Sequence, residues 1–285
     1  MGHGDCASTT RNDRPDAALR VHAVWQSTAS IMTTKTAAVK VDRLTKSFET
    51  GAAVEDLSFG VRENEFVTLV GPSGCGKSTT LRMISGLVPP TQGKVYIRGK
   101  EVDRPIGDVG MVFQSPVLLP WRSTISNVLF MAEMRGKKAG EYRQRALDLI
   151  KLASLEGFEK RYPHELSGGM QQRVSICRAL LLSPSLLLMD EPFGALDIMT
   201  REKMGFELQK IWSASKTTVL FVTHSITEAV LLSDSIIVMT ARPGKLKAVI
   251  NVDLPRPRDT KTLSDARFVE LAAAVRDNIE AQWVE

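Results

Sequence analysis

Residues 71–79 constrain the fold of this chain more than any other part of the sequence. They read G-P-S-G-C-G-K-S-T, which fits the pattern G-x-x-x-x-G-K-[ST]. A short apolar run at 66–70 precedes them, and a stretch with helical character at 79–87 follows them. A strand, a glycine-rich turn and a helix in this order predict a loop whose backbone N–H groups converge on phosphate oxygens. The alternative interpretation is an ordinary strand-to-helix turn.

Each residue type in this loop has a use in phosphate binding. Lys77 can reach the β- and γ-phosphates, and the Ser78 hydroxyl suits Mg²⁺. We expect Cys75 to serve as a small side chain rather than as a nucleophile. The candidate binding residues are Gly71, Pro72, Ser73, Gly74, Cys75, Gly76, Lys77, Ser78 and Thr79.

Two carboxylates follow a second apolar run. Residues 186–189 predict a buried strand, and Asp190 and Glu191 come directly after it. A charge at the mouth of a buried strand is tolerated when it is paired or bound to a metal. We therefore expect Asp190 to hold Mg²⁺, directly or through water, and Glu191 to orient and polarise an attacking water. Since an apolar run ending in Asp-Glu is also a common strand end, this interpretation depends on the glycine loop.

Predicted strands and helices alternate along most of the chain. The predicted strands are 39–44, 57–61, 66–70, 94–97, 109–113, 186–189, 219–222 and 236–239. Between 115 and 182 the apolar spacing becomes helical, which predicts an inserted lobe. Strands alternating with helices indicate an α/β core with a parallel sheet. A helical tail carries an apolar stripe, from Phe268 to Ile279, that is expected to pack on the same chain; a partner helix is the alternative.

Composition excludes several classes of protein. At 285 residues with 43% hydrophobic side chains, the chain can form one large domain with a sizeable core. No run approaches the roughly 18 to 20 apolar residues of a membrane-spanning helix. Residues 1–35 lack the pattern of a secretory signal, so export is not expected. The net charge of +5 is scattered rather than striped, and nucleic acid is not an expected partner.

Residues 166–173, L-S-G-G-M-Q-Q-R, predict a second helix N-terminus and therefore a further anion site. This segment resembles the signature of the ATP-binding-cassette (ABC) ATPases, and the resemblance covers roughly residues 37–250. It implies a P-loop NTPase (RecA-like) core with a parallel sheet, an antiparallel β subdomain and an inserted α-helical subdomain. The expected organisation is a poorly ordered extension at 1–35, an ABC ATPase domain at 36–250, with the helical subdomain at about 115–182, and a C-terminal tail at 251–285.

The resemblance also implies ATP and Mg²⁺ as cofactors and a dimer of ATPase subunits. Two ATP molecules would lie between the subunits, and the signature segment would complete the site of the second subunit. The signature residues concerned are Ser167, Gly168, Gly169 and Gln171. ATP binding would close the dimer, and hydrolysis would remove the γ-phosphate contacts that hold it closed.

Four other positions match the family one by one. Phe48 matches the aromatic residue that stacks on adenine, although a lone Phe also suits a core. Gln114 matches the residue that contacts Mg²⁺ and the attacking water and senses the membrane partner. Asp197 matches the loop that links the two sites across the dimer. His224 matches the switch histidine at the γ-phosphate; since a lone His is more often structural, its role depends on its place after a strand.

The roles that follow form two sets. The expected catalytic residues are Glu191, His224, Gln114 and Lys77, and the expected Mg²⁺ ligands are Ser78, Gln114 and Asp190.

Within the family, residues 119–121, 191–197, 241–244 and 254–258 are similar to the ATPase subunits of nitrate, sulfonate and taurine importers. That subgroup also includes importers of other small solutes, such as thiamine-precursor pyrimidines. The expected function is to couple ATP hydrolysis to solute uptake, from the cytoplasmic face of the inner membrane.

The expected partners are integral-membrane permease subunits, docking near Gln114 to Trp121, and indirectly a solute-binding protein. The docking segment is unusually apolar for a connection, which also suits a small core of the lobe.

Two other classes share parts of this pattern. A soluble ABC ATPase acting in translation, DNA repair or cluster assembly would have every phosphate motif. However, the translation ATPases usually carry two cassettes in one chain and the repair ATPases carry long coiled coils, and this sequence shows neither feature. A non-enzymatic nucleotide sensor would be expected to lack Lys77, Glu191 or His224, all of which are present.

Overall fold

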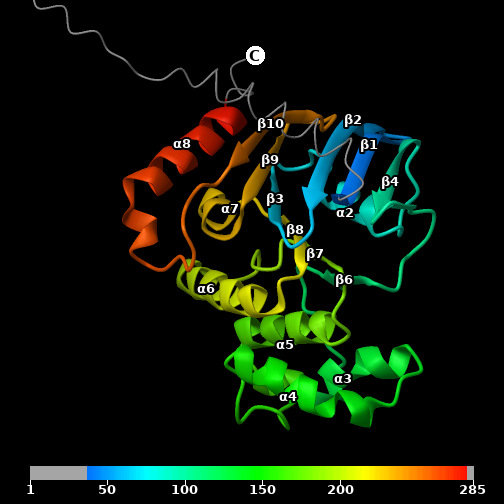
Figure 1. The fold of residues 1–285 in the computed structure, drawn as a ribbon, viewed down its shortest axis with the longest axis vertical. Coiled ribbons are helices and arrows are strands. Elements are labelled where there is room, and N and C mark those ends of the chain that lie inside the picture. The colour runs from blue at the N-terminus through cyan, green and yellow to red at the C-terminus, as the bar shows by residue number, and fades with distance from the viewer. Residues whose placement is uncertain (1–36, 281–285) are drawn as a thin grey trace, which may run out of the picture.

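Two β-sheets organise the part of the chain that the computed structural model describes, residues 37–280 (Figure 1). The extension predicted at 1–35 lies outside this range. One sheet has six strands and the other has four.

The six-stranded sheet forms the centre of the molecule. Its strands in spatial order are β10 (Leu246–Asn251), β9 (Ser235–Met239), β3 (Phe66–Val70), β8 (Thr218–Val222), β7 (Leu186–Asp190) and β6 (Val109–Val112). All neighbouring pairs are parallel except β10 with β9. Every residue of β3, β7, β8 and β9 is buried, as in parallel strands covered on both faces. Because parallel strands end at the same edge, Gly71, Gln114, Glu191 and His224 follow their strands along one edge.

The smaller sheet is antiparallel. Its strands in spatial order are β2 (Gly51–Arg62), β1 (Ala37–Phe48), β4 (Gln92–Ile97) and β5 (Lys100–Glu101). Phe48 pairs with Gly51, so β1 and β2 form a long hairpin whose tip is Glu49 and Thr50. This sheet is the antiparallel subdomain that the family resemblance implies.

Helix α2 (Lys77–Ile84) packs between the two sheets. Its buried residues Leu81, Met83 and Ile84 share a core with Val67 and Leu69 of β3 and with the inner face of the smaller sheet. The alternate residues Phe66 and Val70 of β3 belong to the core on the opposite face of the larger sheet. The period of two along the strand therefore divides the side chains between two cores.

A helical lobe lies between β6 and β7, at the bottom of Figure 1. It contains α3 (Thr124–Met134), the 3₁₀ turn η1 (Ala139–Tyr142), α4 (Arg143–Leu152), the 3₁₀ turn η2 (Pro163–Glu165) and α5 (Gly168–Leu180). Helix α5 lies between this lobe and the body, and its buried side chains are continuous with the core on both sides. This is the stretch for which the apolar spacing predicts an inserted lobe.

The remaining helices cover the face of the larger sheet opposite α2. They are α6 (Ile198–Ser215), α7 (Ile226–Leu232) and α8 (Ala266–Glu280), with the 3₁₀ turn η3 (Thr262–Ser264) before α8. Phe268, Leu271 and Val275 of α8 are buried against α7 and the sheet, so the stripe packs on its own chain, as expected. Within residues 37–280 no helix has the length and apolar character needed to cross a membrane.

The structure differs from the sequence-based prediction in several elements. Strands β1 and β2 are longer than the predicted 39–44 and 57–61, and the short strand β5 was not predicted. Strand β10 was not predicted; only its Ala248 is buried, so it shows no clear apolar pattern. Helix α2 begins at Lys77 rather than at 79 and ends at Ile84 rather than at 87, with Gly86 in the left-handed region at φ 76°. Strand β6 ends at Val112, one residue earlier than predicted.

Candidate functional site

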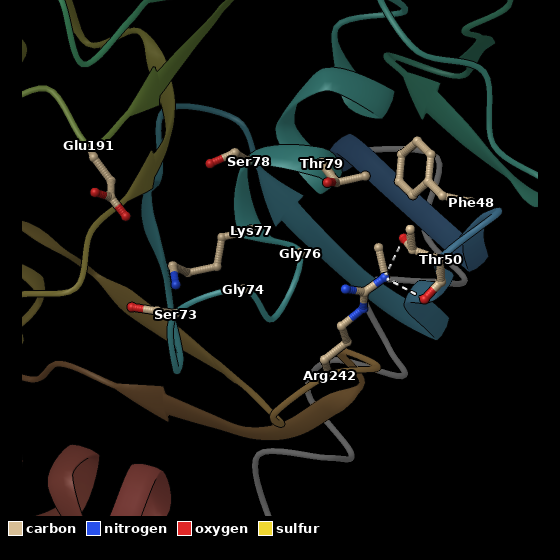
Figure 2. A pocket seen from close by; sticks show the side chains of 11 residues that line it. Phe48, Thr50, Ser73, Gly74, Gly76, Lys77, Ser78, Thr79, Glu191 and Arg242 are labelled. Atoms are coloured by element: carbon tan, nitrogen blue, oxygen red, sulfur yellow. Dashed lines mark hydrogen bonds between the residues drawn. The ribbon is translucent and has the colours of Figure 1, made fainter.

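A pocket of about 410 Å³ lies over the loop between β3 and α2 (Figure 2). It is lined by Phe48, Thr50, Ala53, Ser73, Gly74, Gly76, Lys77, Ser78, Thr79, Glu191 and Arg242. The lining residues come from the β1–β2 hairpin, the glycine loop, the end of β7 and the connection after β9. Phe48 and Glu191 lie at opposite ends of the pocket.

The glycine loop is shaped by close contact with strand β2. Gly76 has φ 94°, and a Cβ there would lie 2.5 Å from Val54 Cγ2 and 2.8 Å from the Ala53 carbonyl oxygen. Any other residue would strain the backbone and collide with β2. Gly76 precedes α2, whose N-terminus has no side-chain cap. The first N–H groups of α2 are thus available to an anion.

The Lys77 side chain folds back over this loop. Its Nζ atom donates to the carbonyl oxygens of Gly71 at 2.9 Å and Pro72 at 3.0 Å. Burial raises the pKa of the neighbouring Cys75 thiol, which disfavours the thiolate. That Cys75 serves as a small side chain rather than as a nucleophile stays a prediction.

Ser78 and Asp190 meet across the site. The Ser78 hydroxyl donates to Asp190 Oδ1 at 2.7 Å, and Asp190 is 9% exposed. A hydroxyl and a carboxylate are the hard oxygen ligands that Mg²⁺ prefers. Within residues 37–280 no cluster of three or more His, Cys, Asp or Glu side chains could hold a metal. This donor set fits an ion that takes its remaining ligands from phosphate and water.

Glu191 and His224 form a second pair at the same edge. Glu191 Oε2 lies 3.4 Å from His224 Nδ1. The Glu191 backbone has φ 45°, and its N–H donates to the Val222 carbonyl at 2.9 Å. A non-glycine residue in this conformation is strained, and such strain persists where surrounding structure holds it. The turn directs the Glu191 carboxylate to one end of the pocket (Figure 2).

Gln114 follows β6 and lies against the loop after Glu191. A Cβ on Gly194 would be 2.9 Å from Gln114 Nε2. Gln114 is exposed and does not line the pocket described above.

Phe48 is the last residue of β1 and is 48% exposed at the pocket. The alternative that it is a core residue is therefore wrong.

The signature residues lie outside this pocket. Ser167 caps α5 by accepting from the Met170 N–H at 3.3 Å, and both Ser167 and Gly168 are exposed. Gln171 donates to the Pro163 and Leu166 carbonyls. Within one chain, the structure does not bring the signature to the glycine loop.

Asp197 caps α6 by accepting from the Thr200 N–H at 3.0 Å. Hydrogen bonding from Thr200 lowers the pKa of its carboxyl. Asp197 too lies outside the pocket lining.

The connection after Gln114 is exposed at two apolar residues. Trp121 is 71% exposed and Val117 is 59% exposed, whereas Leu118 packs against the core. Helix α5 fixes the connection through Arg178, which donates to the Val117 carbonyl at 2.8 Å and to the Pro116 carbonyl at 3.0 Å. Both interpretations of the segment, core and surface, apply to different residues of it.

Sequence reasoning missed a buried charged pair beside Glu191 and His224. Glu228, on the first turn of α7, is 7% exposed and accepts from the Thr223 hydroxyl at 2.6 Å. Its other oxygen lies 3.4 Å from Arg201 Nε. Burial raises the pKa of the Glu228 carboxyl, opposed by the Thr223 hydrogen bond and the Arg201 charge.

Arg201 joins this pair to the loop before α6. Its Nη2 atom donates to the carbonyl oxygens of Leu196 at 3.2 Å and Gly194 at 3.4 Å. The sequence also did not predict that Thr50, Ala53 and Arg242 line the pocket. Arg242 is more than 160 residues from the glycine loop, and no spacing rule connects the two.

Comparisons with known proteins agree with this geometry. Residues 54–194 match the family model described as ABC transporter. An uncharacterized ABC transporter ATP-binding protein of Methanocaldococcus jannaschii is 52% identical, over 79% of this chain and 86% of the relative. A taurine import ATP-binding protein of Rhizobium johnstonii is 45% identical, over 80% of this chain and 88% of the relative. An aliphatic sulfonates import ATP-binding protein of Bacillus cereus is 41% identical, over 85% of this chain and 96% of the relative.

Two solved structures have the same fold. The dimeric structure of MJ0796, a bacterial ABC transporter cassette, has a TM-score of 0.66 at 35% identity and covers 76% of this chain and 100% of that chain. A dimeric post-hydrolysis state of the same cassette, bound to ADP and Pi, has a TM-score of 0.65 at 35% identity and the same coverage.

Proposed function

This chain belongs to the ABC transporter family as an ATP-binding ATPase, and we propose that it powers an importer for a small solute. One observation carries the ATPase function: the glycine loop, the Ser78–Asp190 pair and the Glu191–His224 pair lie at one edge of a single sheet. The import function is supported by relatives that are named as import ATP-binding proteins over most of this chain.

The phosphates of ATP would lie on the glycine loop. The N–H groups at the start of α2 and the Lys77 ammonium would neutralise them, since phosphoryl transfer depends mainly on positioning and charge stabilisation. Ser78 and Asp190, joined by Gln114, would hold Mg²⁺, which when bound offsets charge on the phosphate oxygens. Phe48, at the other end of the pocket, would stack on adenine.

Glu191 is placed to act on the attacking water. Its carboxylate would accept a hydrogen bond from the water and polarise it, and His224, 3.4 Å away, would contact the γ-phosphate. Hydrolysis requires no covalent intermediate on the protein in this scheme, because water is the nucleophile throughout.

The position of the signature segment supports the need for a dimer. Ser167, Gly168, Gly169 and Gln171 stand at or near the N-terminus of α5, away from their own glycine loop. In a head-to-tail pair they would face the phosphates bound by the second subunit, with Asp197 at the contact between the two sites. Dimeric structures of a similar cassette support this arrangement.

The transported solute would be a small molecule such as nitrate, a sulfonate or taurine; a thiamine-precursor pyrimidine is the alternative. The protein would be peripheral at the cytoplasmic face of the inner membrane, with permease subunits at the segment from Gln114 to Trp121. Specificity would reside in the permease and a solute-binding protein.

Glu191→Gln tests the catalytic proposal. The amide keeps the size of the side chain but is a far weaker base, so we expect ATP hydrolysis to fall by roughly 10²-fold or more. ATP should then hold the dimer closed, which size-exclusion chromatography with light scattering would detect. A variant that hydrolyses ATP at the parental rate, or stays monomeric with ATP, contradicts the role of Glu191.

Isolation from native membranes in a mild detergent tests the import proposal. Co-purification of a multi-helix membrane subunit, with a solute-binding protein, would support an importer and lead to its solute. Companions without membrane subunits would leave the ATPase function standing and contradict transport.

A further inference from the structure

Arg242 lies in the connection between β9 and β10 and lines the end of the pocket where Phe48 lies. Figure 2 shows its guanidinium beside Thr50 at the end that also holds Phe48, far from Glu191. None of the roles above uses this side chain.

The guanidinium is bonded to the tip of the β1–β2 hairpin. Nη2 donates to Thr50 Oγ1 at 3.1 Å and to the Thr50 carbonyl at 3.2 Å, and Nε donates to the Ala52 carbonyl at 3.1 Å. Phe48, two residues before Thr50, is the last residue of β1. These bonds therefore fix the backbone that carries the Phe48 ring.

The backbone around Arg242 is itself held against the glycine loop. The Gly244 N–H donates to the Ala53 carbonyl at 3.0 Å, and the Glu55 N–H donates to the Gly244 carbonyl at 3.0 Å. A Cβ on Gly244 would lie 2.0 Å from the Cys75 carbonyl oxygen. Gly244 thus contacts both strand β2 and the glycine loop.

We propose that Arg242 is a positioning residue for nucleotide binding: it holds the hairpin so that Phe48 stands at a fixed distance from the phosphate loop. In bound ATP the adenine ring has to reach Phe48 while the phosphates lie at the N-terminus of α2. The distance between the β1–β2 hairpin and α2 therefore decides whether both contacts can form together. The two-residue tip, Glu49 and Thr50, is exposed. This inference rests on the proposed adenine contact of Phe48.

The chemistry of the contact distinguishes arginine from lysine. Nε and Nη2 of one planar group together donate to three acceptors. A lysine ammonium keeps the charge but has a single donor atom, so it cannot reproduce this fork. Arg242→Lys should therefore retain only part of the MgATP affinity that Arg242→Ala loses.

The test compares two ligands that share phosphates but not a base. Dissociation constants for MgATP and for Mg-tripolyphosphate are measured on the purified full chain by titration calorimetry. Arg242→Ala should weaken MgATP about tenfold, comparable to losing one or two charge-assisted hydrogen bonds, and leave tripolyphosphate binding unchanged. The matched control Arg104→Ala removes an exposed arginine whose ion-pair partner within residues 37–280 is its neighbour Asp103. This variant should change neither dissociation constant.

A double-mutant cycle separates positioning from direct binding. If Arg242 acts through the Phe48 ring, Arg242→Ala should lower MgATP affinity only slightly in a chain that already carries Phe48→Ala. In steady-state assays Arg242→Ala should raise KM for ATP with kcat nearly unchanged, because the Glu191 end is untouched.

Three results would overturn the inference. Arg242→Ala could weaken MgATP and Mg-tripolyphosphate binding equally, its loss of MgATP affinity could add to that of Phe48→Ala in the double-mutant cycle, or it could leave MgATP affinity unchanged. Retained tripolyphosphate binding also shows that the variant is folded at the glycine loop; should Arg242→Ala fail to fold, Arg242→Lys is measured in its place. A parental chain that does not hydrolyse ATP would contradict the proposed function instead.

Discussion

The ion pair between the buried Glu228 and the partly exposed Arg201 leads to a prediction about stability and its dependence on pH. Glu228 is 7% exposed, and Arg201 Nε is the cation that lies against it at 3.4 Å. Arg201→Met keeps most of the aliphatic length but leaves a buried carboxylate without a cation. Breaking a buried pair in this way costs about 3–5 kcal/mol. Because Arg201 is partly exposed and its bonds to Gly194 and Leu196 are long, we expect the lower end, about 3 kcal/mol.

The pH dependence follows from the Glu228 carboxyl. Burial raises its pKa in the folded state, so the folded protein binds the proton more tightly than the unfolded chain. Such a group lowers stability as pH rises from the unfolded pKa through the folded one. Removing Arg201 raises the folded pKa further and extends this loss to higher pH. The penalty of Arg201→Met should thus be small at low pH, where Glu228 is protonated, and largest above neutrality.

Urea unfolding at about pH 5 and pH 8 measures this penalty. In the double variant Arg201→Met/Glu228→Gln the buried charge is absent, so most of the lost stability should return. Arg267→Met is the matched control, because its ion pairs with Asp253 and Glu270 are exposed and should contribute about 0–1 kcal/mol. Additive losses in the double variant, or a penalty that is the same at both pH values, would refute the reasoning.

Two further predictions concern Trp121 in the docking segment and Gly244 beside the glycine loop. Trp121→Ala should weaken binding to the permease, measured by pull-down from membranes, while ATP hydrolysis by the isolated chain is unchanged, because Trp121 is 71% exposed and does not line the pocket. Unchanged permease affinity would remove this role. Gly244→Ala should lower both the melting temperature and nucleotide affinity, because its Cβ would lie 2.0 Å from the Cys75 carbonyl, whereas Gly140→Ala, with no atom within 4 Å, should change neither. An equal drop in melting temperature with and without ATP would show that the Gly244 contact does not affect nucleotide binding, and an unchanged melting temperature would show that it does not affect stability.

The sequence predicts the parts of this fold that local patterns determine. The strand, glycine loop and helix around residues 66–84 follow from apolar runs, glycines and a Lys-Ser pair that are contiguous in the chain. The ABC fold class follows from the order of several such segments, and the structure and comparisons confirm it. The inward stripe of α8 was also readable, since its spacing is regular.

Other features depend on contacts between distant segments. Glu228 lies on the first turn of α7, where an acidic residue ordinarily faces solvent, and its partner Arg201 is on another helix. Arg242 reaches the hairpin only because the β9–β10 connection pairs with β2. Strand β10 has a single buried residue and relies on β9 for its pairing. No local periodicity marks these three features.

The position of α5 has a mechanical consequence. One end of this 13-residue helix carries Ser167, and near the other end Arg178 is bonded to the segment that leads to Trp121. A helix of this length is a stiff rod of about 20 Å, and neither of its ends can shift alone. A displacement of residues 116–117 should therefore be transmitted along α5 to Ser167, and a permease that contacts Trp121 would act on the signature segment through this helix.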